Sequence, residues 1–279
     1  MKKKLLIILL PLMSIASAMG QSNEYAELIK EGMKALQCDS ASKAESLFIQ
    51  AINIKPTEQS SAILHQYLGQ MRSRQGRTNE ALEAFNAGLQ LTPTSESLLM
   101  DRASLYIQVN KLNYALNDLN DILTLNRNNV EALFFRAYIY SEQHLNSKAR
   151  SDYERLLTLQ PNHRKARIGL ALLCDKDKRP QEAMEHMDVL FRYWPNDATL
   201  YIVRGGMHQK RRHFEQALSD MNRAIELEPE NAEFYISRAL LYKDFREKGR
   251  AINDLRKAMQ LGASGEICAE IIGSFDEKR

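Results

Sequence analysis

The chain has 279 residues, of which 38 are Lys or Arg and 35 are Asp or Glu. Three of the basic residues are Lys2–Lys4, so the remainder of the chain carries no formal net charge and lacks the basic excess typical of nucleic-acid binding. Three cysteines scattered along the chain exclude a disulfide framework and a paired-cysteine metal site. We expect Cys38, Cys174 and Cys268 to be small packing residues, with one disulfide as the alternative.

Residues 1–18 have the three zones of a secretory signal peptide. Lys2–Lys4 form the basic zone, Leu5–Met13 form the apolar zone, and Ala16–Ala18 supply the small residues of a cleavage site. The alternative is an uncleaved membrane anchor, but the apolar zone is shorter than the roughly 20 residues that cross a bilayer. We predict cleavage after residue 18, export to the periplasm or the cell exterior as a soluble protein, and no integral membrane segment after cleavage.

From residue 25 onward the sequence repeats itself. Each repeat contains one alanine with a large apolar residue four positions later, a Gly or Ala twelve positions earlier and, in five of seven repeats, a proline twelve positions later. The first interval between these alanines is 37 residues and every later one is 34. The alanines are Ala44, Ala81, Ala115, Ala149, Ala183, Ala217 and Ala251.

Each repeat predicts a helical hairpin. It holds two segments with apolar residues at three- and four-residue spacing, separated by a short polar turn such as Asn110–Lys111. Small residues let the two helices approach closely, and proline ends the second helix because it removes a hydrogen-bond donor and clashes with the preceding turn. One hairpin cannot bury its apolar face alone, so the hairpins must stack into an array.

This pattern resembles the tetratricopeptide repeat family over residues 25 to 263. With each repeat numbered from one, position 8 is Gly or Ala, position 20 is Ala, position 24 is large and position 32 is Pro; position 27, usually Ala, is instead Ile122, Leu156 and Leu190 in the middle repeats. The resemblance implies an all-α fold, an α-α superhelical solenoid of seven helix-turn-helix repeats. We assign residues 19–263 to this solenoid and residues 264–279 to a C-terminal capping helix and tail.

The capping helix is expected to start after Ser264, a residue type that caps helix N-termini. Its apolar residues Ile267, Ile271, Ile272 and Phe275 fall near one face of a helix. We expect this face to cover the end of the solenoid.

Arg at position 7 and Asp at position 23 occur together in four repeats, whereas the other three repeats have neither residue. We predict an ion pair that joins the two helices of each of these repeats and stabilises the fold. The alternative is a row of arginines that binds a ligand. The predicted pairs are Arg102–Asp118, Arg136–Asp152, Arg204–Asp220 and Arg238–Asp254.

In tetratricopeptide arrays the first helix of each hairpin lines a concave groove, and the resemblance implies that positions 2, 5, 9, 12 and 13 meet the ligand. We expect this groove to accept an apolar segment of a partner protein, with lysines at the rim holding an acidic group. The alternative is that the apolar residues only pack between neighbouring first helices. The candidate groove residues are Met100, Phe134, Tyr138, Lys165, Ile168, Leu172, Lys176, Ile202, Lys210, Ile236 and Leu240.

Two further features concern the groove. Some relatives clamp a terminal carboxylate with Lys, Asn and Arg, but position 5 has no Lys and position 9 has no Asn in repeats two to seven. The fifth repeat has Arg167 where an apolar residue is usual, together with Arg164, Lys165 and a charged turn from Asp175 to Arg179. The fifth repeat is either a specialised contact site or a repeat that tolerates unusual residues because its neighbours keep it folded.

No nucleophile elbow, phosphate loop or metal-spaced histidine set is present in the sequence. Glu182 and His186, with Asp175 or His163, are the best metal candidates, but two ligands one turn apart are more typical of a solvated helix face. We therefore predict a protein-binding adaptor or assembly scaffold without enzymatic activity, cofactor or metal. The alternatives are a self-assembling scaffold, which implies a homo-oligomer, and a cell-wall or glycan hydrolase.

Overall fold

The computed structural model describes residues 23–275, so the predicted signal peptide and residues 276–279 lie outside the described residues. Within 23–275 the chain forms fifteen α-helices and no strand, in agreement with the predicted fold class. The first helices of the seven hairpins are α2 (Asn23–Gln37), α4 (Ser61–Arg74), α6 (Glu96–Gln108), α8 (Val130–Glu142), α10 (Arg164–Lys176), α12 (Ala198–Lys210) and α14 (Ala232–Asp244). The second helices are α3 (Ala41–Ile54), α5 (Thr78–Leu91), α7 (Leu112–Leu125), α9 (Asn146–Leu159), α11 (Pro180–Tyr193), α13 (Phe214–Leu227) and α15 (Lys248–Gln260), and α16 (Gly265–Gly273) follows them.

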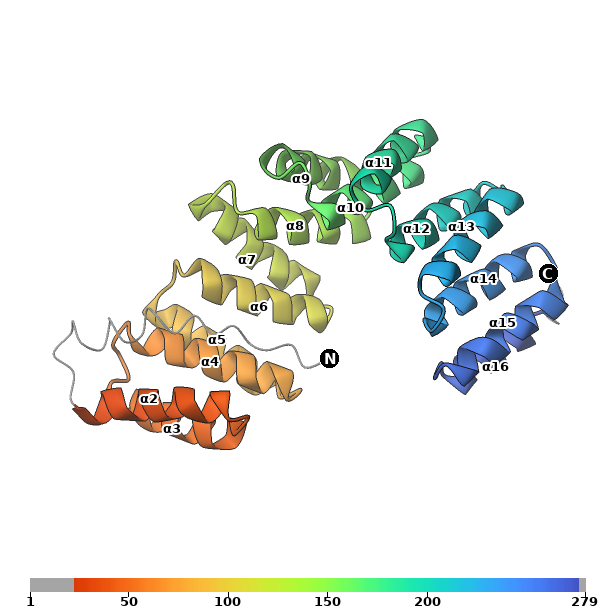
Figure 1. Cartoon of the computed structure of the whole chain (residues 1–279). Helices are drawn as coiled ribbons and strands as arrows, with labels where there is room; N and C mark the ends of the chain where they lie inside the picture. Colours follow the sequence, from red (N-terminus) through yellow and green to blue (C-terminus); the bar gives the residue numbers. More distant parts are fainter. Residues whose placement is uncertain (1–22, 276–279) are drawn as a thin grey trace. The chain divides into compact units, whose positions relative to one another are not determined.

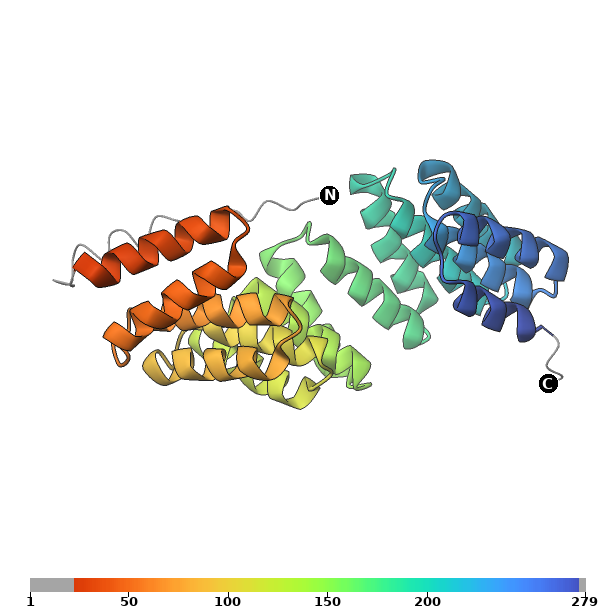
Figure 2. The same ribbon diagram turned by 90° about the horizontal axis from the view of Figure 1, so that it is seen from below.

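The chain divides into two compact units between Ile139 and Tyr140, inside α8. In each unit the two helices of a hairpin pack against each other and consecutive hairpins stack side by side (Figures 1 and 2). First helices also contact the first helix of the next repeat, as α4 does with α6 in the first unit and α12 with α14 in the second. Each unit therefore presents one surface made of first helices and another made of second helices.

The turn inside every hairpin has the same backbone. Position 15 has a positive φ in all seven repeats, from 55° at Asp39 to 75° at Gly76. The next N–H closes the turn by donating to the carbonyl of position 11, as Arg179 does to Cys174 at 2.8 Å. This pairing is a helix-terminating motif that favours glycine, yet glycine occupies the position only in the second repeat.

Close packing between paired helices explains the small residues. Every alanine at position 20 is fully buried, as expected. The glycine or alanine at position 8 faces position 24 of the same repeat: a Cβ on Gly32 would lie 2.6 Å from Cε1 of Phe48. Glycine at Gly32 is therefore required by the phenyl ring that it faces. At position 27 the larger residues Ile122 and Leu156 are fully buried.

Second helices end in the same way whether or not proline follows. Thr92, which precedes Pro93, has φ −136° and ψ 76°, and Asn126, which precedes Arg127, has φ −136° and ψ 91°. Proline disfavours the helical conformation of the residue before it. Because Asn126 adopts this extended conformation without proline, proline is not required to end α7.

The last helix covers the seventh repeat with three of the four expected apolar residues and with Cys268. Cys268 is fully buried, and Ile271, Ile272 and Phe275 pack against the cluster that contains Leu255. Ile267, in contrast, is 52% exposed, because it lies at the edge of this face of the helix. Ser264 occupies the N-cap position of α16, but its side chain makes no capping hydrogen bond.

The three cysteines are free thiols, so the alternative of a disulfide is not realised. Cys174 and Cys268 are buried as expected, whereas Cys38 is exposed and is not a packing residue. None of the helices within residues 23–275 combines the length and the apolar character needed to cross a membrane.

Candidate functional site

We call the surface formed by positions 2, 5, 9, 12 and 13 of the first helices the first-helix face, and we describe it separately for each unit. In the first unit it includes Met100 on α6 and Phe134 and Tyr138 on α8. Met100 and Phe134 are half-buried, and the Phe134 ring packs edge-on against Phe135 at 5.5 Å. Tyr138 is 41% exposed, so it is the residue of this set most available to a partner.

In the second unit the face separates into packing residues and exposed residues. Ile168, Ile202 and Ile236, all at position 5, are half-buried, and the last two pack against the same core cluster. Leu172 and Leu240, both at position 9, are 40% and 38% exposed. Position 5 therefore contributes mainly to packing between repeats, and position 9 provides the apolar side chains that reach solvent.

The three predicted rim lysines, Lys165, Lys176 and Lys210, are all exposed. Lys210 lies 3.7 Å from Asp175, whose side chain is only 5% exposed and also pairs with Arg211. Lys176 donates to the backbone carbonyl of Ser141 at 3.4 Å. Within residues 23–275 no carboxylate lies at ion-pair distance from Lys165 or Lys176, which lie at opposite ends of α10.

Predicted ion pairs are present in three repeats. Arg204 donates to both carboxylate oxygens of Asp220 at 2.9 and 2.7 Å. The same bidentate geometry joins Arg102 to Asp118 and Arg238 to Asp254. These aspartates are less than a tenth exposed, and the hydrogen bond to the partner aspartate is the main cause that raises the pKa of each arginine. The geometry supports a structural role.

Arg136 and Asp152, the fourth predicted pair, belong to different units. Asp152 is buried, and Arg136 donates to Asn120 at 2.8 Å. An equivalent bond joins Arg102 to Asn86 at 2.6 Å and Arg238 to Asn222 at 2.7 Å. The asparagine occupies position 25 of the preceding repeat in each case, so the arginine connects repeats as well as helices. These asparagines were not predicted from the sequence, although position 25 is Asn only in repeats that precede such an arginine.

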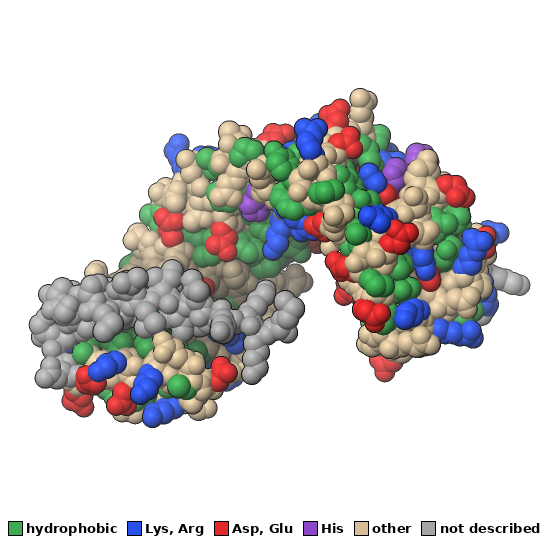
Figure 3. All heavy atoms as spheres, viewed as in Figure 1, with side chains coloured by type: hydrophobic (Ala, Val, Ile, Leu, Met, Phe, Trp, Pro, Cys, Tyr) green, Lys and Arg blue, Asp and Glu red, His purple; other side chains and the backbone are tan. Residues whose placement is uncertain are grey.

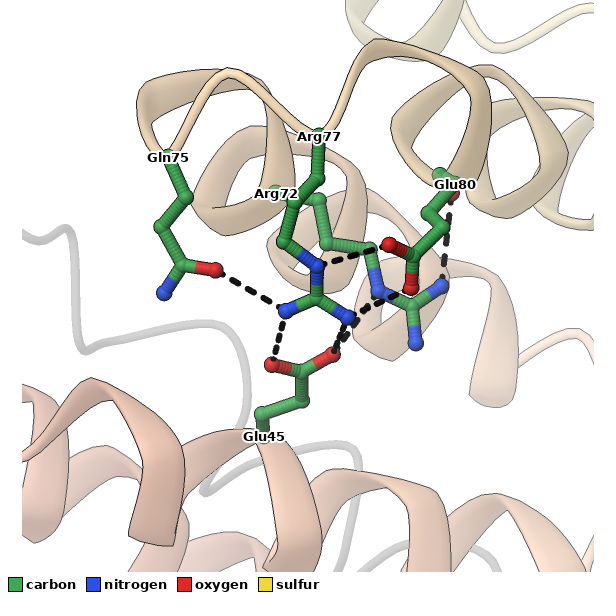
Figure 4. Close-up of polar contacts among 5 residues, drawn as sticks. All are labelled: Glu45, Arg72, Gln75, Arg77 and Glu80. Atoms are coloured by element: carbon green, nitrogen blue, oxygen red, sulfur yellow. Dashed lines mark hydrogen bonds and ion pairs between the residues drawn. The ribbon is translucent and has the colours of Figure 1, made fainter.

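A cluster at the junction of the first two repeats was also not predicted (Figure 4). Glu45 on α3 accepts hydrogen bonds from Arg72 on α4 at 2.8 Å and from Arg77 at 2.7 and 3.0 Å. Arg77 also donates to Glu80 at 2.8 Å. The hydrogen bond from Arg77 is the largest cause that lowers the pKa of Glu45. The cluster joins the first repeat to the second, and both of its carboxylates are paired with arginines.

The corresponding junction between the fourth and fifth repeats has the opposite charge at the same position. Arg150 replaces the glutamate at position 21 and donates to Glu182 at 2.7 Å and to the sulfur of Cys174 at 3.4 Å. Cys174, Glu182 and His186 are also the three side chains that bring potential metal-ligand atoms within 4.8 Å of one another. Cys174 is thus a third candidate ligand that sequence spacing did not reveal.

The electrostatics of this cluster do not favour a metal ion. The Arg150 guanidinium already occupies the position between Cys174 and Glu182 that a cation would take. Burial raises the pKa of the Cys174 thiol, and burial followed by the charge of Arg167 lowers the pKa of His186. We therefore interpret the cluster as a junction between repeats, like the one around Glu45.

Two surface depressions occur at connections between repeats, along Gln160–Lys165 and along Glu228–Glu233. Both are open hollows beside the start of a first helix, and neither contains the position 9 leucines. On the face shown in Figure 3, acidic and basic side chains are interspersed with hydrophobic ones. The described part of the chain therefore offers shallow surfaces for contact with a macromolecule.

Comparisons with known proteins agree with this architecture. Residues 136–198 match the sequence family described as tetratricopeptide repeat. A crystal structure of a tetratricopeptide repeat protein from Parabacteroides merdae aligns with a TM-score of 0.81 and 26% identity, covering 92% of this chain and 100% of that one. No curated protein sequence matches the chain. Residues 136–198 thus match the tetratricopeptide repeat family in sequence, and the chain has the fold of a tetratricopeptide repeat protein.

More distant structures share the fold alone. Pseudomonas aeruginosa pilF aligns with a TM-score of 0.57 and 18% identity, covering 76% of this chain and 97% of that protein. A chain of the Cut9–Hcn1 hetero-tetramer aligns with a TM-score of 0.62 and 13% identity, covering 95% of this chain and 55% of that one. At these identities the similarity says nothing about a partner or pathway.

Proposed function

We propose that the chain is a non-catalytic interaction module that binds a segment of a partner protein on its first-helix face. The observation that carries this proposal is the exposure of Leu172 and Leu240 at equivalent positions of the second unit, next to half-buried isoleucines. Apolar surface of this kind gains free energy when another molecule removes it from water. The fold supports this role, since stacked repeats present extended surfaces for binding.

The proposed place of action is the cell envelope, as a soluble periplasmic or secreted protein. Residues 1–18 have the composition of a signal peptide, which supports export of the chain. In that compartment the chain acts as an adaptor or assembly scaffold, and its partner is an envelope or secreted protein.

The test is a capture experiment with the chain from residue 19 onward and the envelope fraction of the source organism. Leu172→Glu with Leu240→Glu alters the face of the second unit, and Tyr138→Glu alters that of the first. Each puts a charge on an exposed position, so the helices are expected to stay folded, which circular dichroism checks. We expect at least one of these variants to lose a protein that the parent retains.

Tyr193→Glu is the matched control, because Tyr193 is 53% exposed but lies on the second helix α11. It should retain the partner. A partner that all variants hold equally would contradict binding on the first-helix face, and loss of the partner only in the Tyr193 variant would move the site to the second helices.

Self-assembly is the second candidate, and one observation favours it. Ile267 on α16 is 52% exposed and Met259 on α15 is 38% exposed, so both apolar side chains reach solvent in the last part of the array. Sedimentation velocity over a hundredfold concentration range separates the two functions: a mass that grows with concentration, and that Ile267→Ser returns to the monomer, indicates a homo-oligomeric scaffold.

A further inference from the structure

The turns inside the hairpins differ between the two units at position 15, where the backbone has a positive φ. In the first unit this position holds Asp39, Gly76 and Asn110, residue types that adopt this conformation readily. In the second unit each of the four turns has a histidine, lysine or arginine there, with φ between 58° and 63°. These four residues, all exposed, are His144, Lys178, Arg212 and Arg246.

Neither the helix ends nor local pairing accounts for these basic side chains. A cation is favourable near the C-terminus of a helix, but the first helices of the first unit end without one at position 15. In the part of the chain that the structure describes, no carboxylate lies at ion-pair distance from Lys178, Arg212 or Arg246. The Arg212 guanidinium lies over the Phe245 ring at 5.1 Å. The three charges are therefore available to another molecule.

The segments around these turns carry more basic than acidic residues. From position 12 to position 19 the four repeats of the second unit hold eleven Lys or Arg against seven Asp or Glu. Three of the acidic residues, Asp175, Asp177 and Glu182, pair with arginines. Asp244 accepts a hydrogen bond from Gln209 at 2.6 Å, and Glu247 lies 3.9 Å from Arg250. The remaining two are Glu142 and Glu215. With every acidic residue counted, the excess of basic residues persists.

The opposite edge of the second unit has the opposite charge. The two helices of a hairpin run antiparallel, so the turns inside hairpins lie at one end of the helices and the connections between repeats lie at the other. The connections at 160–165, 194–199 and 228–233 hold two basic and four acidic residues. Neighbouring first helices contact each other, as α12 and α14 do, and packed helices lie about 8–10 Å apart. The position 15 side chains therefore form a row along one edge, which we call the turn edge.

The chemistry of the turn edge suits a lipid surface. Its basic side chains lie at the tips of exposed turns, whereas both surface depressions lie at connections on the opposite edge. Leu145, which follows His144 in the chain, is 40% exposed, so an apolar side chain accompanies the cations. An anionic membrane offers many headgroup charges in one plane and an apolar layer beneath them. An acidic polypeptide offers the charges without the apolar layer.

We infer that the turn edge of the second unit binds the surface of a membrane that contains anionic lipids, with Lys178, Arg212 and Arg246 as the main contacts. The position 15 row is not part of the first-helix face, so membrane binding goes beyond the proposed function and does not depend on it. The two surfaces together would let the chain hold a protein partner at a membrane.

Co-sedimentation with lipid vesicles tests membrane binding of the chain from residue 19 onward. One set of vesicles is phosphatidylcholine alone, and the other contains about one third phosphatidylglycerol, which is anionic. At about 0.1 M salt we expect the chain to sediment with the mixed vesicles and to stay in solution with phosphatidylcholine. Binding to the mixed vesicles should weaken as salt is added, because salt screens the attraction between the cations and the headgroups.

Lys178→Gly with Arg212→Gly and Arg246→Gly is the decisive variant. It should lower the partition onto the mixed vesicles by about a hundredfold, because each cation near an anionic leaflet contributes roughly fivefold. The same variant should resist urea better than the parent does, because glycine adopts the positive φ without strain. A purely structural role of the cations predicts the opposite change in stability, so the two measurements separate binding from folding.

Arg192→Gln with Arg223→Gln and Arg256→Gln is the matched control, since it removes the same charge from exposed positions of α11, α13 and α15. These positions lie about 13 Å or more along the helix axis from the turns, farther than the Debye length of about 10 Å at 0.1 M salt. The control should bind the mixed vesicles nearly as well as the parent does.

Three outcomes would overturn membrane binding by the turn edge. Equal losses in the two triple variants would attribute binding to net charge alone. Equal binding of the parent to both kinds of vesicle would exclude recognition of anionic lipid. Binding of fluorescent polyglutamate in preference to the mixed vesicles would identify an acidic protein as the partner. These outcomes leave the capture experiment unaffected, because its variants lie on the first-helix face.

Discussion

Two adjacent glycines on α12 have different surroundings. Gly205 faces the second helix of its own repeat, where a Cβ would lie 3.3 Å from the Ala217 carbonyl oxygen, whereas a Cβ on Gly206 would meet open space. Both are in a helix interior, where glycine is less favourable than alanine by roughly 0.5–1 kcal/mol.

Gly206→Ala should therefore stabilise the second unit by about 0.5–1 kcal/mol, because it removes conformational freedom from the unfolded chain without a clash. Gly205→Ala should stabilise the second unit less than Gly206→Ala does, or destabilise it, because the added methyl group must displace neighbouring atoms. Urea denaturation followed by circular dichroism measures both. Equal effects of the two substitutions would contradict the different surroundings described for these glycines.

The contribution of the bidentate Arg–Asp pairs to stability can be tested by removing one partner and then both. Asp220→Ala leaves the half-buried Arg204 without its counter-charge and should destabilise the second unit by about 1–3 kcal/mol. Arg204→Leu added to it should recover part of this loss, because the second repeat has Leu68 and Ala84 at these positions. The leucine also keeps apolar contact with Phe191, over which the Arg204 guanidinium now lies at 4.2 Å.

Comparing the denaturation midpoints of the two single variants and the double variant tests this account. If the double variant is less stable than Asp220→Ala alone, the arginine contributes mainly through contacts other than the pair.

At the scale of the hairpin, the turn residue at position 15 determines how each pair of helices is joined. Six of the seven repeats place a residue other than glycine in the left-handed region, which costs roughly 1–2 kcal/mol for a residue with a Cβ. The turn is nevertheless retained, because its hydrogen bond from position 16 to position 11 satisfies a carbonyl at the end of the first helix.

Lys178→Gly should raise the stability of the second unit by about 0.5–1 kcal/mol, because glycine adopts the φ of 58° without strain. Gly76→Ala should lower the stability of the first unit by a similar amount for the opposite reason. Thermal melts of the two variants, with Lys165→Gly expected to destabilise α10 as a control for helix propensity, distinguish a turn effect from a general effect of glycine.

At the scale of the whole array, each repeat is stabilised by its contacts with the neighbouring repeats, so the apolar surface of the last repeat must be covered by another element. Removal of residues 264–279 should uncover Tyr242 and Leu255, which Ile271, Ile272 and Phe275 now help to cover. We expect amide hydrogen exchange in α14 and α15 to accelerate by about tenfold or more, while exchange in α4 and α5 stays unchanged.

Ile267→Ser is the control for this truncation. Ile267 is 52% exposed and is not part of the cluster around Leu255, so its replacement should leave hydrogen exchange in α15 as it is in the parent. Uniform acceleration across all helices after truncation would instead indicate that the described repeats unfold as a single cooperative unit.

The sequence was sufficient to predict the family, the seven hairpins, and the Arg–Asp pairs seen in three repeats, because each is encoded by residue types that recur at fixed positions. It was not sufficient for features that differ between equivalent positions. Cys174 and Arg150 lie in different hairpins, and nothing in their spacing indicated that the guanidinium contacts the sulfur. The ligand role of Leu172 and its neighbours stays a prediction.

The sequence by itself determined the repeat, because the small residue at position 8, the alanine at position 20 and the large residue at position 24 meet within one hairpin whatever lies around it. Only the tertiary structure decided which side chains of the first helices reach solvent. Ile202 and Leu240 are both large and apolar, yet the first is half-buried and the second is exposed. The physical reason is that exposure depends on how neighbouring repeats cover a position, which is a property of the packed array.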